Sequence, residues 1–293
     1  MATFNEWVGG ARPRTLPAAI SPVLVGTGAA AAVGASDSAD ALLALCVALA
    51  LQVGVNYAND YSDGVRGTDA TRVGPVRLVG QGLSAPSSVK FAAFLSFALA
   101  GLFGLALVAI TQTFILIPIG IGAIVAAWTY TGGDRPYGYR GLGEVMVFVF
   151  FGLVATLGTL YTQALTLTLP GLLGAVGIGS LASAILVANN LRDLPGDAAA
   201  GKHTLAVRLG DAKTRSLWVA LVAVAMACAV GTALIRPWAL LALGSLVFAA
   251  RPVRALRSGA TGRELIPVLA GTGILQLAYA VLLAIGLSIG GAA

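Results

Sequence analysis

Residues 41–63, ALLALCVALALQVGVNYANDYSD, run from an apolar stretch directly into a group of polar side chains. A helix needs about 20 predominantly apolar residues to cross a bilayer, and the stretch 41–59 is close to that length. A carboxylate at the centre of a spanning helix costs about 2.5–3.5 kcal/mol on insertion scales, so grouped acids beside such a helix need a reason. The stretch therefore predicts a membrane protein with a functional site at a helix end.

The composition of the whole chain agrees with this stretch. Of its 293 residues, 58% are hydrophobic and only 10% are charged. Soluble domains carry about 25% charged residues, so the composition excludes an ordinary soluble domain. The two cysteines, Cys46 and Cys228, lie inside apolar runs, and with a single histidine they indicate neither a disulfide framework nor a zinc site.

Apolar stretches predict nine membrane-spanning helices. Their expected bounds are 15–34, 41–59, 89–110, 113–131, 143–163, 170–190, 216–235, 237–251 and 265–289. With nine crossings, 17 of the 18 basic residues fall on one side of the membrane and Arg236 alone on the other. The positive-inside rule then places the N-terminus in the cytoplasm and the C-terminus outside. This orientation in the plasma (inner) membrane accounts for the net charge of +6, so no nucleic-acid partner is indicated.

A second acidic group follows the sixth expected span. It reads Asn189-Asn190-x-Arg192-Asp193-x-x-x-Asp197. The spacing Asn56-x-x-x-Asp60 recurs as Asn189-x-x-x-Asp193, each at the end of an even-numbered span. We interpret this as one domain, 1–293, built from two related halves at about 10–140 and 141–290, with chance recurrence as the alternative.

The spacing of the acids suits a divalent cation. On a helix, Asp60 and Asp63 project about 60° apart and Asp193 and Asp197 about 40° apart, so each pair can present both carboxylates to one face. Mg²⁺ relieves the repulsion between such pairs and typically binds one or two carboxylates plus substrate phosphates. Basic residues near both groups suit a diphosphate carried by the metal. They are Arg66, Arg77, Arg192 and Lys202.

These motifs resemble those of the UbiA-type intramembrane prenyltransferases, in the form found in the dihydroxynaphthoate branch of that family. The resemblance rests on Arg12-Pro13-Arg14-Thr15-Leu16-Pro17-Ala18, Asn59-Asp60-Tyr61-Ser62-Asp63 through Asp69, Gly74-Pro75-Val76-Arg77, Asn189-Asn190-Leu191-Arg192-Asp193 and Gly201-Lys202-His203-Thr204-Leu205. One departure is that Asp69 lies six residues after Asp63 rather than four.

The resemblance implies a fold and a reaction. The expected fold is an all-α integral membrane bundle of nine transmembrane helices around a central cavity, with a cytoplasmic cap. The implied reaction transfers a polyprenyl chain from its diphosphate to 1,4-dihydroxy-2-naphthoate, with loss of CO₂ and diphosphate, giving demethylmenaquinone. The implied cofactor is Mg²⁺.

The expected site follows from the motifs and the resemblance together. Asp60, Asp63, Asp193 and Asp197 are expected to bind Mg²⁺ and to act in catalysis with Lys202. The expected substrate-binding residues are Asn59, Arg66, Asp69, Arg77, Tyr139, Asn189, Asn190 and Arg192. Aromatic residues that could line the cavity and stabilise an allylic cation, or anchor the helices at the membrane interface, are Tyr57, Tyr61, Trp128, Tyr130, Tyr137 and Tyr139.

Other interpretations stay open at this point. Asp69 and Glu144 are candidates for a base that deprotonates the acceptor, but Glu144 equally suits the dipole at a helix start and Asp69 a solvated loop. The acceptor could instead be 4-hydroxybenzoate, homogentisate, haem or a phosphoribosyl sugar. A secondary transporter also carries acids in its membrane helices, but near mid-membrane rather than at helix ends.

Overall fold

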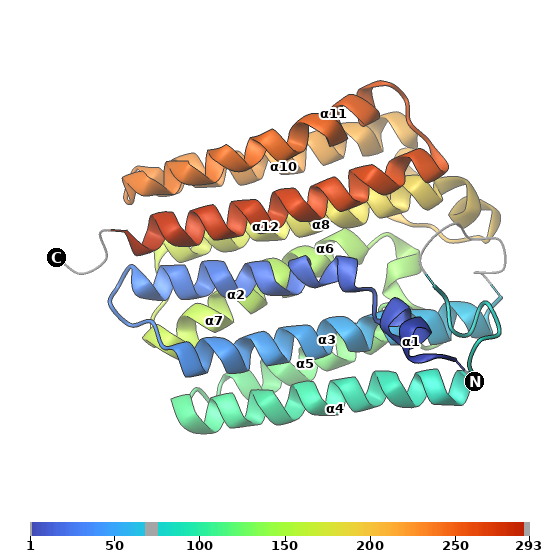
Figure 1. Cartoon of the computed structure of the whole chain (residues 1–293), viewed down its shortest axis with the longest axis horizontal. Coiled ribbons are helices and arrows are strands. Elements are labelled where there is room, and N and C mark those ends of the chain that lie inside the picture. Colours follow the sequence, from blue (N-terminus) through green and yellow to red (C-terminus); the bar gives the residue numbers. More distant parts are fainter. Residues whose placement is uncertain (1, 68–75, 290–293) are drawn as a thin grey trace.

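The computed structural model describes residues 2–67 and 76–289. Within these ranges the chain consists of helices and their connections, without strands. The long helices run side by side along one direction, and α1 (Phe4–Ala11) lies at the opposite end of the bundle from the last turn of α12 (Figure 1). The all-α prediction is confirmed.

Seven helical segments are long and apolar enough to cross a membrane. They are α3 (Ser38–Val65), α4 (Pro86–Thr111), the continuous run of α6 (Gly143–Val147), η3 (Phe148–Val154) and α7 (Ala155–Ala164), α8 (Leu169–Ala199), α10 (Asp211–Ala233), η4 (Pro237–Ala249) with α11 (Ala250–Arg257), and η5 (Gly262–Leu265) with α12 (Ile266–Ser288). Each overlaps one of the predicted spans, so the chain is a multi-pass membrane protein.

The two remaining predicted spans contain shorter helices. The first, at 15–34, is α2 (Leu16–Ala31), with 16 residues, and the fourth, at 113–131, is α5 (Leu116–Thr129), with 14 residues. Both are shorter than the roughly 20 residues needed for a straight crossing. α2 begins directly after the short η1 (Pro13–Thr15), and a turn with Gly34 at positive φ follows it. Nine crossings therefore stay a prediction.

α2 packs closely against its neighbours because glycine occupies the contact positions. A Cβ added at Gly26 would lie 2.5 Å from the backbone oxygen of Thr156 on α7, and one added at Gly28 would lie 2.7 Å from the Cα of Ala284 on α12. Small residues at such crossings let helix backbones approach each other in membrane bundles. α2 is therefore held between α7 and α12, where it lines part of a central cavity.

The tightest packing lies on the side of α8, α10 and α12. Trp218 and Tyr279 are fully buried there, and each has a hydrogen-bond partner for its polar atom. Trp218 Nε1 donates to Thr272 Oγ1 at 3.2 Å, and the Tyr279 hydroxyl donates to the carbonyl of Ala225 at 3.0 Å. A smaller core around Tyr57 joins α3 and α4. A cavity, described below, separates these two packed regions.

Candidate active site

Both acidic motifs lie on helices that continue past the predicted spans. α3 has 28 residues and carries Asp60 and Asp63 in its last two turns, and α8 has 31 residues and carries Asp193 and Asp197 in its last two turns. At about 1.5 Å per residue, α8 is longer than the hydrocarbon core of a bilayer. The motifs therefore sit at helix ends, as their sequence positions predict.

A glycine turn brings Lys202 back over the end of α8. Gly201 has a φ of +69°, a left-handed conformation that glycine adopts without steric cost. The Lys202 backbone N–H then donates to the carbonyl of Asp197 at 2.9 Å. The local sequence Gly201-Lys202 therefore directs the lysine side chain toward the acids instead of toward solvent.

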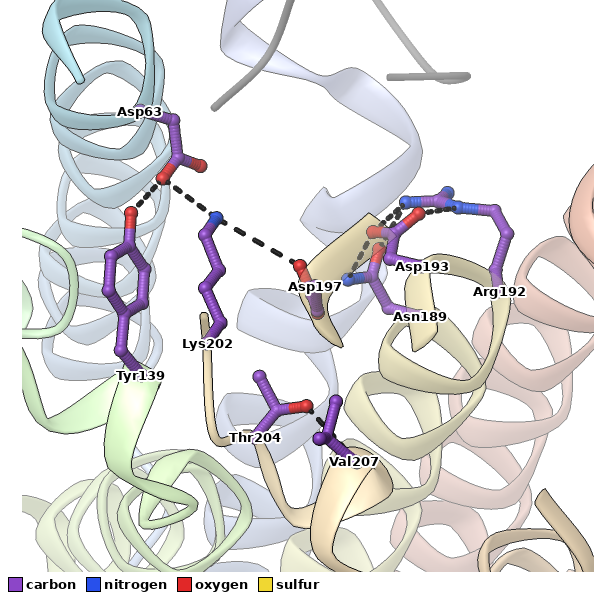
Figure 2. A network of polar contacts seen from close by, with 9 residues as sticks. All are labelled: Asp63, Tyr139, Asn189, Arg192, Asp193, Asp197, Lys202, Thr204 and Val207. Carbon is purple, nitrogen blue, oxygen red and sulfur yellow. Dashed lines mark hydrogen bonds and ion pairs between the residues drawn. The ribbon is translucent and has the colours of Figure 1, made fainter. Parts of the chain in front are cut away.

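Lys202 connects the two motifs (Figure 2). Its Nζ lies 3.2 Å from Asp63 Oδ1 on α3 and 3.9 Å from Asp197 Oδ1 on α8. Lys202, Asp63 and Asp197 are all buried. In such a group, loss of one member leaves an uncompensated buried charge, which is strongly unfavourable. The ammonium therefore links the ends of α3 and α8, although Lys202 and Asp63 are 139 residues apart in the sequence.

Tyr139, in η2 (Tyr137–Arg140), completes the group around Asp63. Its hydroxyl donates to Asp63 Oδ1, and the Lys202 ammonium lies 4.4 Å from the centre of its ring. Burial raises the pKa of the Tyr139 hydroxyl well above its ordinary value, and the Asp63 carboxylate raises it further. Tyr139 is therefore a neutral hydrogen-bond donor at physiological pH.

Arg66 lies beside the same tyrosine ring but is held by backbone carbonyls. Its guanidinium donates to the carbonyls of Thr131 and Gly133 and lies 5.4 Å from the centre of the Tyr139 ring. Asn59, one turn earlier on α3 than Asp63, accepts a hydrogen bond from Thr131 Oγ1 at 2.8 Å. Thr131 and Gly133, in the connection after α5, are thus hydrogen-bonded to the end of α3.

Arg192 and Asp193 form a two-bond ion pair on α8. Arg192 donates from Nε to Asp193 Oδ1 and from Nη2 to Asp193 Oδ2, both at 2.7 Å. The same Nη2 also donates to Asn189 Oδ1 at 2.9 Å. Figure 2 shows this group beside Asp197. The predicted phosphate ligand Arg192 and the predicted metal ligand Asp193 therefore neutralise each other in this structure.

Asp60 has different neighbours from Asp63. Its Oδ2 accepts the backbone N–H of Leu78 at 2.7 Å, and its Oδ1 accepts that of Val79 at 3.1 Å. The side chain is fully buried, whereas Asp63 lines the cavity. Asp60 thereby fastens Leu78 and Val79 to the end of α3.

The second motif extends to a buried glutamate. Asn190 Nδ2 donates to Glu144 Oε1 at 2.8 Å, and Glu144 is only 6% exposed at the start of α6. The sequence placed Glu144 at a helix start but did not indicate this contact. Arg77 is buried on the cavity wall, and Asp69 lies outside the described residues.

A cavity of about 1090 Å³ opens between the two packed regions. Its polar end contains most of the predicted site residues. Those that line it are Asn59, Asp63, Arg77, Tyr139, Asn189, Asn190, Arg192, Asp197 and Lys202. Much of the remaining wall is apolar and includes Leu51, Leu105, Ile124, Phe150 and Phe151. The cavity therefore combines a charged end with space for a long apolar chain.

The aromatic residues divide between the cavity and the helix packing. Tyr130, Tyr137 and Tyr139 line the cavity. Tyr57 instead donates to the carbonyl of Trp7 at 3.0 Å, and Tyr61 stacks on Trp128 with ring centres 6.1 Å apart. Three of the six predicted cavity aromatics thus pack between helices.

The sequence did not predict several polar residues of the cavity wall as ligand-facing groups, among them Thr15, Gln52 and Asn56. Asn56 had been noted only for its spacing to Asp60. The available signal was the presence of Gln52 and Asn56 inside an apolar span, where an amide needs hydrogen-bond partners.

The donor atoms at the charged end fit a magnesium ion. Among the described residues, no three Asp, Glu, His or Cys side chains are grouped as a ready metal site. Mg²⁺ however needs only one or two carboxylates, because water and substrate phosphate supply its other ligands. The Lys202 ammonium lies between Asp63 and Asp197, which marks the position as one where carboxylate oxygens from both motifs stabilise a cation.

Comparison with known proteins agrees with this arrangement. The model of the UbiA prenyltransferase family matches residues 19–265, and the chain belongs to this family. It is 56% identical over 290 residues to a 1,4-dihydroxy-2-naphthoate octaprenyltransferase of Mycobacterium tuberculosis, covering 99% of each chain. It is 40% identical over 271 residues to the Escherichia coli K12 protein of the same name, covering 90% of this chain and 87% of that one.

Solved structures share the fold. A UbiA homolog from Archaeoglobus fulgidus bound to GPP and Mg²⁺ superposes with a TM-score of 0.69 at 14% identity, over 97% of this chain and 99% of the other. A homolog from Aeropyrum pernix K1 gives a TM-score of 0.69 at 16% identity, over 93% and 97%.

Proposed function

We propose that this protein transfers a polyprenyl chain from polyprenyl diphosphate to 1,4-dihydroxy-2-naphthoate, with loss of CO₂ and diphosphate, giving demethylmenaquinol, the reduced form of demethylmenaquinone. The observation that carries the proposal is the cavity, with Asp63, Asp197 and Lys202 at one end and a largely apolar wall beyond. Relatives named for this reaction, at 40–56% identity over most of the chain, support the choice of acceptor.

The charged end would bind the diphosphate. Asp63, Asp193 and Asp197 are the proposed Mg²⁺ ligands, and Asp60 remains a predicted one although backbone amides occupy its oxygens. Mg²⁺, when bound, would neutralise charge on the diphosphate as a Lewis acid. Lys202, Arg77, Arg192 and Arg66 would add positive charge, and Asn59, Asn189, Asn190, Tyr139 and Asp69 complete the proposed substrate-binding set.

The reaction breaks the allylic C–O bond and the bond between the acceptor ring and its carboxylate, and it forms a C–C bond between the prenyl chain and the ring. The electron pair of the broken ring–carboxylate bond stays with the ring when CO₂ leaves. The leaving diphosphate takes the electron pair of the C–O bond, so buried cations and hydrogen-bond donors at that end favour ionisation. The apolar wall excludes water, which would otherwise capture the allylic cation. The rings of Tyr130, Tyr137 and Tyr139 line the same cavity and can stabilise the cation through their faces.

The proposed setting is the plasma (inner) membrane, crossed nine times, with the charged end of the cavity in the cytoplasm. η2, α9 (Leu205–Leu209) and the residues around Leu78 would form the cap. Two observations support this topology. Seventeen of 18 basic residues sort to one side, and α1 and the last turn of α12 lie at opposite ends of the bundle (Figure 1).

The test is an assay of the purified protein in lipid nanodiscs with a polyprenyl diphosphate, with and without Mg²⁺. With 1,4-dihydroxy-2-naphthoate we expect a prenylated, decarboxylated product and release of diphosphate, and loss of both on chelation by EDTA. Parallel reactions with 4-hydroxybenzoate and homogentisate serve as acceptor controls. Product from either of these, and none from dihydroxynaphthoate, would overturn the proposal.

A further inference from the structure

A second polar group lies on the cavity wall, away from the acidic motifs. It consists of Gln52 and Asn56, one turn apart on α3, and Thr15 of η1, and all three line the cavity. Gln52 is 7% exposed and Asn56 is 3% exposed. Burying an amide is costly unless it is hydrogen-bonded, so the partners of these side chains reveal which of their atoms remain for a ligand.

Thr15 fixes the orientation of both amides. Its hydroxyl donates to the carbonyl of Arg12 at 2.9 Å and accepts from Gln52 Nε2 at 3.0 Å and from Asn56 Nδ2 at 2.9 Å. Asn56 Nδ2 also donates to the carbonyl of Ala11 at 2.9 Å. A backbone carbonyl can only accept, and the Thr15 proton is already used, so both amides must turn their NH₂ groups toward this cluster.

This arrangement uses the NH₂ groups of Gln52 and Asn56 and leaves their amide oxygens available to a ligand. Within residues 2–67 and 76–289, no hydrogen bond uses Gln52 Oε1 or Asn56 Oδ1. Both side chains line the cavity, so the two oxygens are open to a molecule inside it. An amide oxygen accepts only, and the matching ligand must therefore bring two O–H or N–H donors.

Gln52 and Asn56 lie on the same face of α3 as the acid at the charged end of the cavity. Gln52, Asn56, Asn59 and Asp63 recur at helical spacing and all line the cavity, so they form one stripe on α3. At about 1.5 Å per residue, Asn56 lies roughly 10 Å along the helix from Asp63. A ring bound at Gln52 and Asn56 would therefore lie beside the diphosphate, deeper along the apolar wall.

We propose that Gln52 and Asn56 bind the aromatic acceptor, each accepting a hydrogen bond from one of its two ring hydroxyls. This inference rests on the proposed function. The hydroxyls of 1,4-dihydroxy-2-naphthoate lie on opposite edges of one ring, a separation comparable to the rise of one helical turn. A prenyl chain carries no donor, and diphosphate oxygens would repel the amide oxygens. A site that pairs with a substrate hydroxyl rejects an analogue without it, because the protein group is left unpaired.

The test combines a variant with analogues that lack one hydroxyl. 1-Hydroxy-2-naphthoate and 4-hydroxy-2-naphthoate are measured as competitive inhibitors of wild type and of Gln52→Met, together with the KM for dihydroxynaphthoate and for the polyprenyl diphosphate. Loss of a hydrogen bond to a buried group should raise the KM for dihydroxynaphthoate about tenfold. The inhibition constant of one analogue, the one without the hydroxyl that Gln52 binds, should stay unchanged, and so should the KM for the diphosphate.

Controls separate this role from a structural one. Gln276→Met makes the same change at a fully buried glutamine of α12 and should alter none of these constants. Thr15→Val removes the hydroxyl that orients both amides and should reduce discrimination between dihydroxynaphthoate and both analogues, which also tests the proposal should Gln52→Met fail to fold. Equal weakening of all three aromatic ligands by Gln52→Met, or a raised KM for the diphosphate, would overturn the inference. Turnover of dihydroxynaphthoate by wild type tests the proposed function separately.

Discussion

Lys202 is the residue through which the two acidic motifs touch, since its ammonium lies near Asp63 on one helix and Asp197 on another. Its position gives it two roles to distinguish, one in balancing buried carboxylates and one in binding substrate. The neighbouring ion pair of Arg192 with Asp193 raises the same question for the second motif. The two roles predict different results on mutation.

Replacing Asp63 by Asn should abolish turnover while the protein still folds. The change removes a charge from the proposed metal site, and the amide still accepts from Tyr139 and fills the same space. We expect less than about a tenth of wild-type activity, an effect above roughly 1.4 kcal/mol on the barrier. Asp211→Asn, which loses only a surface pair with Arg215, is the matched control and should keep activity. Activity of Asp63→Asn near that of the control would contradict the metal role.

Replacing Lys202 by Met should weaken binding of the prenyl diphosphate and slow its ionisation. The apparent affinity for dihydroxynaphthoate should change little, because the proposed acceptor position is further along α3. Saturation curves for each substrate, in wild type and variant, provide the measurement. A raised half-saturation for the aromatic acid alone would assign Lys202 to the acceptor carboxylate instead.

At this scale the sequence indicated which residues gather but not how they pair. Nine of the residues that the motifs predicted for the site line the cavity, whereas Asp60, Arg66 and Asp193 are not among its lining residues. Their roles stay predictions. Pairing depends on tertiary structure: Lys202 meets an acid 139 residues away, and Asp60 meets amides 18 and 19 residues further on. Thr15 was missed for the same reason, whereas Gln52 carried the signal of an amide inside an apolar span.

At the scale of elements, hydropathy predicted the helices well and their ends less well. α3 and α8 continue past the apolar stretches although Asn, Asp and Gly are poor helix formers and α8 contains Pro195, because polar side chains at their ends find hydrogen-bond partners there. α2 and α5 are shorter than the apolar stretches that predicted them. Apolar residues in turns are indistinguishable from helical ones by composition, so the stretch overestimated the helix.

The contact between α2 and α12 should be sensitive to a single methyl group. A Cβ at Gly28 would lie 2.7 Å from backbone of Ala284, whereas one at Gly120 on α5 would meet nothing within 4 Å. Gly28→Ala should therefore destabilise the protein by about 1–3 kcal/mol through overpacking. Gly120→Ala should be neutral or stabilising, because glycine weakens a helix interior. Thermal unfolding in one detergent compares the two, and equal melting temperatures would argue against the close α2–α12 packing.

At the scale of the whole molecule, two packed regions enclose a cavity that is charged at one end and largely apolar along the rest of its wall. Composition predicted a membrane protein, since no soluble core accounts for 58% hydrophobic residues, and the apolar stretches together with the family resemblance predicted that it is all-α. The cavity itself was implied only by family resemblance, because empty volume has no local sequence signal. The two related halves stay a prediction.

Topology is testable in cells. Reporter fusions after Gly34, Thr166 and Ala293 should all read outside the cytoplasm, and a fusion after Ala199 should read inside, because 17 of 18 basic residues sort to one side. The short helices α2 and α5 make the experiment informative. A cytoplasmic reading after Gly34 would show that α2 does not cross.

Asp60 holds a later part of the chain against the end of α3. By accepting the amide of Leu78 it joins two points 18 residues apart, and it does so from the rigid end of α3. Holding together two points at that separation costs an unfolded chain roughly 2–3 kcal/mol of entropy, in the part that depends on chain length. The two amide bonds to one carboxylate offset part of that cost and keep Leu78 and Val79 against the end of α3. Loss of the Asp60 carboxylate should therefore release Leu78 and Val79 from the end of α3.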